Sequence, residues 1–109
     1  MRPMSPMSLS DDEFLRALES CTLPAAEFSH AAHVRAAYLY LRDGGFDGAL
    51  ARIRRSIKAY SAHLGKADRY DEAMTVAYLE LIHRRMGECP EGGWEAFARS
   101  NPEVLARRL

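Results

Sequence analysis

The sequence predicts an all-α protein: a compact four-helix core with short helical turns at its C-terminal end. Apolar residues recur three and four positions apart along most of the chain, which is the spacing of one helix face. Val and Ile, which favour strands, occur only three times each, and no stretch of six residues alternates apolar with polar side chains. Proline and glycine divide the chain into four helical segments.

Composition fits one folded domain. The chain has 109 residues, of which 48% are hydrophobic and 28% charged, enough to build a core. We expect residues 10–109 to form this domain. Residues 1–9 lack the apolar segment of a signal peptide and read as a flexible arm.

Charge and cysteine content exclude several classes of function. Fifteen Lys and Arg balance fifteen Asp and Glu, so the basic excess that favours nucleic-acid binding is missing. No apolar run approaches the length of a membrane span. Cys21 and Cys89 lack the spacing of a disulfide framework or metal site, which predicts reduced thiols and a cytoplasmic location.

The first two helices are predicted at residues 10–21 and 30–44. Ser10 and Glu13 form a capping box at the start of the first. Ser29 is the N-cap expected for the second, which ends at Gly44-Gly45. This second helix is apolar on most sides, and Arg35 and Arg42 are expected on its solvent side.

The next two helices are predicted at residues 46–64 and 69–86, the latter with Asp68 as its N-cap. Arg54, Arg55 and Lys58 are expected on the exposed side of the third helix. Its apolar stripe should be buried: Phe46, Leu50, Ile53, Ile57, Tyr60 and Leu64. Two short turns follow, in which Trp94 and Phe97 are expected to cover the core.

Polar residues are expected to gather at one end of the bundle. Short loops imply that neighbouring helices alternate in direction, so the second and fourth helices begin where the third ends. His30 and His33 lie one turn apart on the apolar side of their helix. The end that they share should also contain His63, Tyr70, Asp71 and Glu72.

Two kinds of chemistry fit this cluster. His30, His33 and Asp71 are a candidate ligand set for a divalent metal, either zinc or iron. Alternatively, the two histidines are a catalytic acid/base pair oriented by Asp71 or Glu72, with Tyr70 as a donor at the rim. Each residue also has a structural explanation, since His33 could be a hydrogen-bonded core histidine and Asp71 could simply support a helix start.

Four strings of the sequence resemble a bacterial family of small helical proteins that has no assigned activity: EFSHAAHVRAAYLYLRDGG, AYSAHLG, RYDEAMTVAYLELI and WEAFARSNPEVL. Family members carry Phe-x-His-x-x-His before an apolar helix and Tyr-His-Glu-Thr before another. The residues that match this pattern are Phe28, His30, His33, Tyr70, Glu72 and Thr75. Asp71 and Ala73 depart from it, standing where the family has His and Thr. The resemblance, which extends from Phe14 to Leu105, implies a shared helical fold and no function.

Two functional hypotheses follow. The first is a small protein with a polar pocket that binds a metal or a small-molecule ligand, or performs acid/base chemistry. The alternative is a helical interaction module without chemistry, forming a homodimer, because the residue 30–44 helix has more apolar surface than three short helices would cover. Neither hypothesis involves a nucleic acid or a membrane.

Overall fold

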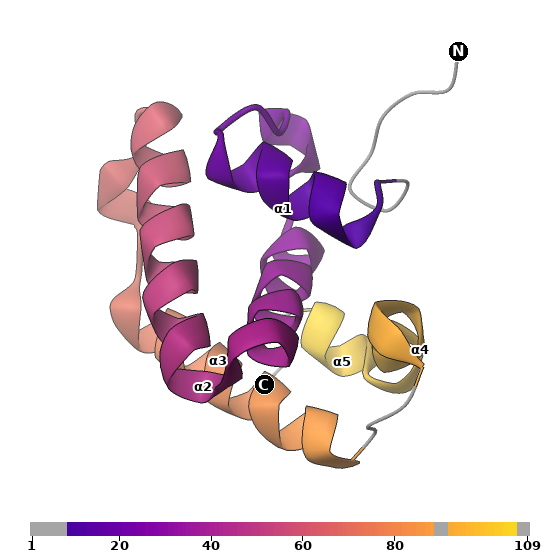
Figure 1. The fold of residues 1–109 in the computed structure, drawn as a ribbon. Helices are drawn as coiled ribbons and strands as arrows, with labels where there is room; N and C mark the ends of the chain where they lie inside the picture. Colours follow the sequence, from indigo (N-terminus) through magenta and orange to yellow (C-terminus); the bar gives the residue numbers. More distant parts are fainter. Residues whose placement is uncertain (1–8, 89–91, 107–109) are drawn as a thin grey trace.

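The structure, a computed structural model, describes residues 9–88 and 92–106, and the regular elements in these ranges are all helical (Figure 1). The elements, in chain order, are α1 (Asp11–Glu19), η1 (Ala25–Glu27), α2 (His30–His63), η2 (Ala67–Arg69), α3 (Glu72–Glu88), α4 (Gly93–Ser100) and α5 (Pro102–Leu105). The predicted all-α fold is confirmed. The predicted arm, apart from Leu9, and the residue Cys89 lie outside the described residues.

The long helix α2 is two helical arms joined at a sharp break. Gly45 has φ 73° and ψ −178°, which is not helical, so residues 30–44 form a first arm and residues 46–63 a second. A straight helix of 34 residues would be about 50 Å long. The molecule measures 37 × 36 × 26 Å, so the break is needed to fold α2 within it. Figure 1 shows the two arms meeting at an elbow in the lower part of the molecule.

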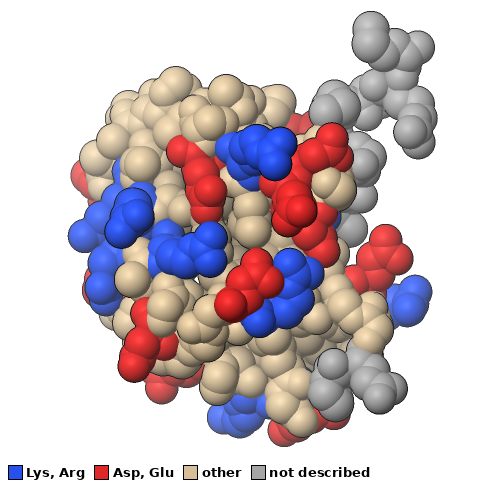
Figure 2. Space-filling view, in the orientation of Figure 1, with Lys and Arg blue, Asp and Glu red and all other residues tan. Residues whose placement is uncertain are grey.

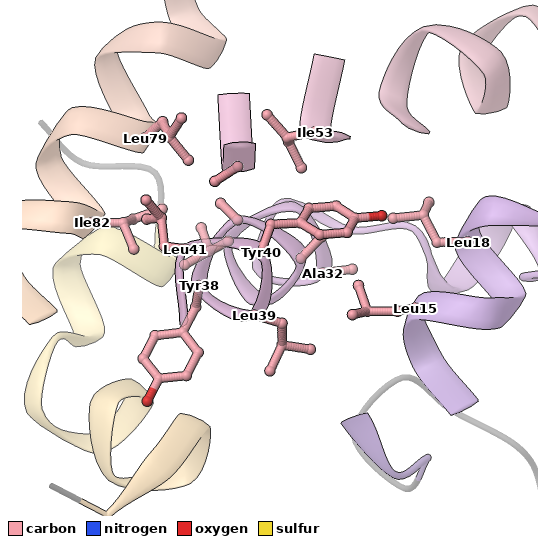
Figure 3. Close-up of a cluster of buried hydrophobic side chains, with 14 of the residues drawn as sticks. Leu15, Leu18, Ala32, Tyr38, Leu39, Tyr40, Leu41, Ile53, Leu79 and Ile82 are labelled. Carbon is pink, nitrogen blue, oxygen red and sulfur yellow. The ribbon is translucent and has the colours of Figure 1, made fainter. Parts of the chain in front are cut away.

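The first arm of α2 is the centre of the core. Helices α1, α3, α4 and α5 each contact α2. Figure 3 shows side chains leaving this arm in all directions, with Leu15 and Leu18 of α1 on one side and Leu79 and Ile82 of α3 on the other. On a further side, the Tyr38 ring lies against α4, whose Trp94 and Phe97 are both buried as predicted.

This packing covers the apolar surface on which the homodimer hypothesis was based. Every residue from Val34 to Leu41 is buried. Among the described residues, Met74 of α3, at 39% exposure, is the one large hydrophobic side chain that is exposed. The expectation that residues 30–44 lack cover within the chain is therefore wrong, because the second arm and four helices surround them. The homodimer stays a prediction without this support.

The second arm has the predicted amphipathic pattern. Ile53, Ile57 and Tyr60 are buried, whereas Phe46, Leu50 and Leu64 are half-buried and pack against the core. Arg55 and Lys58 are exposed, and Arg54 is half-buried. In Figure 2, acidic and basic side chains are interspersed over the visible face of the molecule. In the described part of the chain, no helix has the length and hydrophobicity that crossing a membrane requires.

Arg35 is buried, which corrects the prediction that it lies on the solvent side of its helix. The residue is only 4% exposed, and its guanidinium donates to the Leu9 carbonyl at 2.8 Å and to Asp11 Oδ1 at 2.9 Å. Its Cζ also lies 4.7 Å from the centre of the Phe14 ring. These contacts of Arg35 therefore hold the start of α1 against the first arm of α2. A helical periodicity cannot reveal such a role, because the acidic partner lies 24 residues away in sequence.

Arg42, by contrast, is exposed, and it also pairs with Asp11. Its Nη1 lies 3.1 Å from Asp11 Oδ2. Partial burial alone would raise the pKa of Asp11. Hydrogen bonds and charge from both arginines outweigh that effect and hold the pKa below its usual value. Asp11 therefore stabilises the fold in its ionised form.

We predict that Arg35→Leu lowers the free energy of unfolding by about 1–3 kcal/mol, because it removes the hydrogen bonds that the buried guanidinium donates to the Leu9 carbonyl and to Asp11. The matched change Arg42→Leu should cost less than about 1 kcal/mol, as exposed ion pairs do. Urea unfolding followed by circular dichroism measures both. Because the folded pKa of Asp11 is lowered, its stabilisation is complete above about pH 4 and is lost as the pH falls further, so the cost of Arg35→Leu should shrink in acid. Equal costs for the two variants at neutral pH would contradict the role of Arg35.

Both ends of α1 are capped. The predicted capping box is present, with the Glu13 N–H 3.1 Å from Ser10 Oγ and the Ser10 N–H 3.0 Å from Glu13 Oε1. At the other end, the Cys21 N–H donates to the Leu18 carbonyl and the Thr22 N–H to the Ala17 carbonyl, which is a Schellman motif. Cys21 has φ 59°, the left-handed conformation in which glycine is usual.

We predict that Cys21→Gly is more stable than Cys21→Ala by about 1 kcal/mol, because both variants lose the thiol but only glycine adopts the left-handed conformation without strain. Thermal unfolding of the two proteins under the same conditions measures the difference. A Cys21→Ala protein as stable as Cys21→Gly would show that the turn does not hold a left-handed residue.

Candidate functional site

A cavity of about 480 Å³ lies where the start of α2, the end of α2 and the start of α3 meet. The alternating helix directions predicted this meeting of three chain segments. Four of the five predicted site residues line the cavity: His30, His33, Tyr70 and Asp71. Polar residues Ser61, Lys66, Thr75 and Tyr78 also line it, together with a larger set of apolar side chains.

His30, the first residue of α2, joins that helix to α5. Its Nε2 lies 3.0 Å from the carbonyl oxygen of Val104, and its ring centre lies 4.7 Å from that of Tyr78 in α3. A carbonyl oxygen only accepts hydrogen bonds, so Nε2 must carry the proton. His30 therefore has a structural role as well as a place in the cavity wall.

His33, one turn further along, packs its ring edge-on against Phe28 with a centre-to-centre distance of 4.2 Å. Its Nε2 is shielded from solvent. Both histidine rings therefore face the protein rather than bulk water. Phe28 also contacts the Tyr60 ring at 4.4 Å, so the segment before α2 fixes the position of His33.

Asp71, rather than the predicted Asp68, caps the helix that follows. The Met74 N–H donates to Asp71 Oδ1 at 3.0 Å, and the Thr75 N–H to the Asp71 carbonyl at 3.0 Å. Asp68 lies in η2, so the predicted helix start at residue 69 is wrong and α3 begins at Glu72. Two aspartates three residues apart give the same capping signal, and the turn at residues 67–69 decides between them.

Glu72 does not line the cavity, which corrects its predicted place in the site. Its carboxylate faces the second arm of α2, with Oε1 3.0 Å from Arg54 Nε and 2.7 Å from the Tyr70 hydroxyl. These hydrogen bonds, from Arg54 first and Tyr70 second, lower the pKa of Glu72 to about 2. Burial first, and then the hydrogen bond to Glu72, raise the pKa of Tyr70. Glu72 therefore stays ionised and is not a proton carrier at neutral pH.

The predicted metal ligands, His30, His33 and Asp71, do not form a metal-binding group. In the described ranges, three or more His, Cys, Asp or Glu side chains nowhere come together in an arrangement that would hold a metal ion. His30 Nε2 is directed at the Val104 carbonyl, and Asp71 Oδ1 accepts from the backbone of α3. The zinc or iron site suggested by the residue types is thus not formed by these side chains.

Sequence reasoning missed part of the cavity wall. His63 was expected at this end but is exposed and does not line the cavity, whereas Ser61 and Lys66 on either side of it in sequence do. Only the helix face of Ser61 could have suggested its position. Nothing in the sequence indicated that Lys66 lines the cavity, because Lys66 follows Gly65, whose φ of 74° changes the direction of the chain.

Comparisons with protein-family models, with curated proteins and with solved structures find no match to this chain. The family resemblance therefore stays a prediction, and the cavity carries the functional argument.

Proposed function

We propose that the protein binds a small, mainly apolar organic molecule in the cavity between the two arms of α2 and α3. The observation that carries the proposal is the cavity itself. Its volume of about 480 Å³ is within the range of small-molecule sites, roughly 300–1,000 Å³. Such sites combine a mostly apolar wall with a few polar groups that orient the ligand.

The wall of the cavity has this composition. Its buried part is aliphatic and comes from both arms of α2 and from α3: Val34, Ala37, Ile53, Ile57, Leu79 and Ile82. Hydrogen-bonding side chains come from the same three segments, including His33 and Tyr70. An apolar ligand would therefore gain from burial, and its polar group would find partners.

Acid/base chemistry on the bound molecule is an extension of this proposal. Within the predicted site, the proton carrier would be an imidazole, because His30 and His33 both line the cavity. Glu72 is turned away and held ionised by Arg54, and Asp71 is engaged as a helix cap.

Filling the cavity tests the proposal. Ala36 and Ala37 are both buried on the first arm, but only Ala37 lines the cavity. We predict that Ala37→Leu leaves the melting temperature unchanged or raises it, because the added carbons occupy empty space. Ala36→Leu should overpack the core and cost about 1–3 kcal/mol.

Titration with the uncharged fluorescent dye N-phenylnaphthylamine reports binding directly. The unmodified protein should enhance the fluorescence of the dye saturably, and Ala37→Leu should weaken the binding at least about tenfold, or by 1.4 kcal/mol. Ala36→Leu, measured at a temperature at which it is folded, should bind the dye as the unmodified protein does. No saturable binding by the unmodified protein, or equal binding by Ala37→Leu, would overturn the proposal.

A further inference from the structure

We infer that the ligand of the cavity is an anionic amphiphile, a monocarboxylate with a hydrocarbon tail, whose carboxylate lies beside Lys66. This inference rests on the proposed function and specifies the class of ligand. It follows from the contrast between the buried side chains of the cavity wall, which are nearly all apolar, and the exposed ones, which include the charged residues Lys66 and Asp71.

Apart from Tyr78, the buried side chains of the wall are aliphatic. These aliphatic residues include Val34, Ala37, Ile53, Leu79 and Ile82. A charged or strongly polar group placed among them would lose its hydration without a matching partner. The hydrocarbon part of a ligand would therefore lie against these residues.

The exposed residues of the wall include Lys66, Asp71 and Met74. Among the described residues, Lys66 is the one Lys or Arg that lines the cavity, and no ion pair or hydrogen bond engages its ammonium. A carboxylate is the natural partner of an ammonium group, because the hydrogen bonds between them are charge-assisted.

Asp71 and the adjacent Glu72 are already engaged. Asp71 Oδ1 accepts the Met74 N–H at the start of α3, where the helix dipole stabilises a negative charge. Glu72 is paired with Arg54 outside the cavity. Lys66 is therefore the charged residue of the wall that lacks a partner within the described chain, and a ligand anion would supply one.

Three ligands with the same tail and different charges test this inference: decanoate, decanol and decylammonium, each used below its micellar concentration or, for decanol, below its solubility limit. Each would be titrated against the protein loaded with N-phenylnaphthylamine. Decanoate should displace the dye with an affinity about tenfold higher than decanol, which corresponds to one charge-assisted hydrogen bond. Decylammonium should bind more weakly than decanol.

A charge-removing variant locates the head group. Lys66→Gln should lower the affinity for decanoate to that for decanol and leave the affinity for decanol unchanged. Lys58→Gln is the matched control, because Lys58 is also an exposed lysine near Tyr70 but does not line the cavity. It should retain the preference for decanoate.

The outcomes separate this inference from the proposed function. Equal displacement by decanoate and decanol, stronger displacement by decylammonium, or an unchanged decanoate preference in Lys66→Gln would overturn the inference while the dye still binds the cavity. Failure of the dye to bind, or an unaffected Ala37→Leu variant, would instead overturn the proposed function.

Discussion

The break in α2 at Gly45 is the constraint on which the rest of the molecule depends. With φ 73° and ψ −178°, Gly45 occupies a backbone region that is essentially restricted to glycine. A Cβ at this position would meet no atom within 4 Å, so the backbone conformation, and not lack of space, requires glycine. The break turns one amphipathic chain segment back on itself. Residues Val34 and Ala37 of the first arm and Ile53 and Ile57 of the second then line the same cavity.

Helices α1, α3 and α5 are held to α2 by a few polar contacts in addition to apolar packing. Arg35 bonds to Asp11 at the start of α1, and the Tyr40 hydroxyl donates to Glu19 at its end. Arg54 pairs with Glu72 at the start of α3, and His30 bonds to the Val104 carbonyl of α5. Apolar packing tolerates small sliding movements, whereas a hydrogen bond specifies a distance and a direction. These contacts therefore set where each helix lies along α2, and hence the shape of the cavity.

Helix positions could largely be predicted from the sequence because they depend on local signals. The stripe that includes Ile53 and Ile57, the capping box at Ser10 and the end of the first arm at Gly44-Gly45 all arise from residues a few positions apart. Features that depend on distant partners were missed. Arg35 was predicted to be exposed because its helix position looked polar, and only the approach of Asp11 allows it to be buried.

In the candidate site, too, some features could be predicted from the sequence and others depend on distant partners. Alternating helix directions were enough to place His30, His33, Tyr70 and Asp71 around one cavity. The direction in which each side chain points was not predictable, because it is decided by partners that a periodic pattern does not identify. Arg54 draws Glu72 outward, and the Val104 carbonyl engages His30. The spacing of these residues therefore predicted a shared location but not a metal centre.

The most direct test of this account compares alanine at the two adjacent glycines of the elbow. Gly44 is exposed and helical, so Gly44→Ala should raise the free energy of unfolding by up to about 1 kcal/mol. Gly45→Ala should lower it by about 1–3 kcal/mol, because alanine is strained at this φ and ψ. Urea unfolding of both variants measures the difference. If Gly45→Ala were as stable as Gly44→Ala, the elbow would not depend on the backbone of Gly45 and the account would be contradicted.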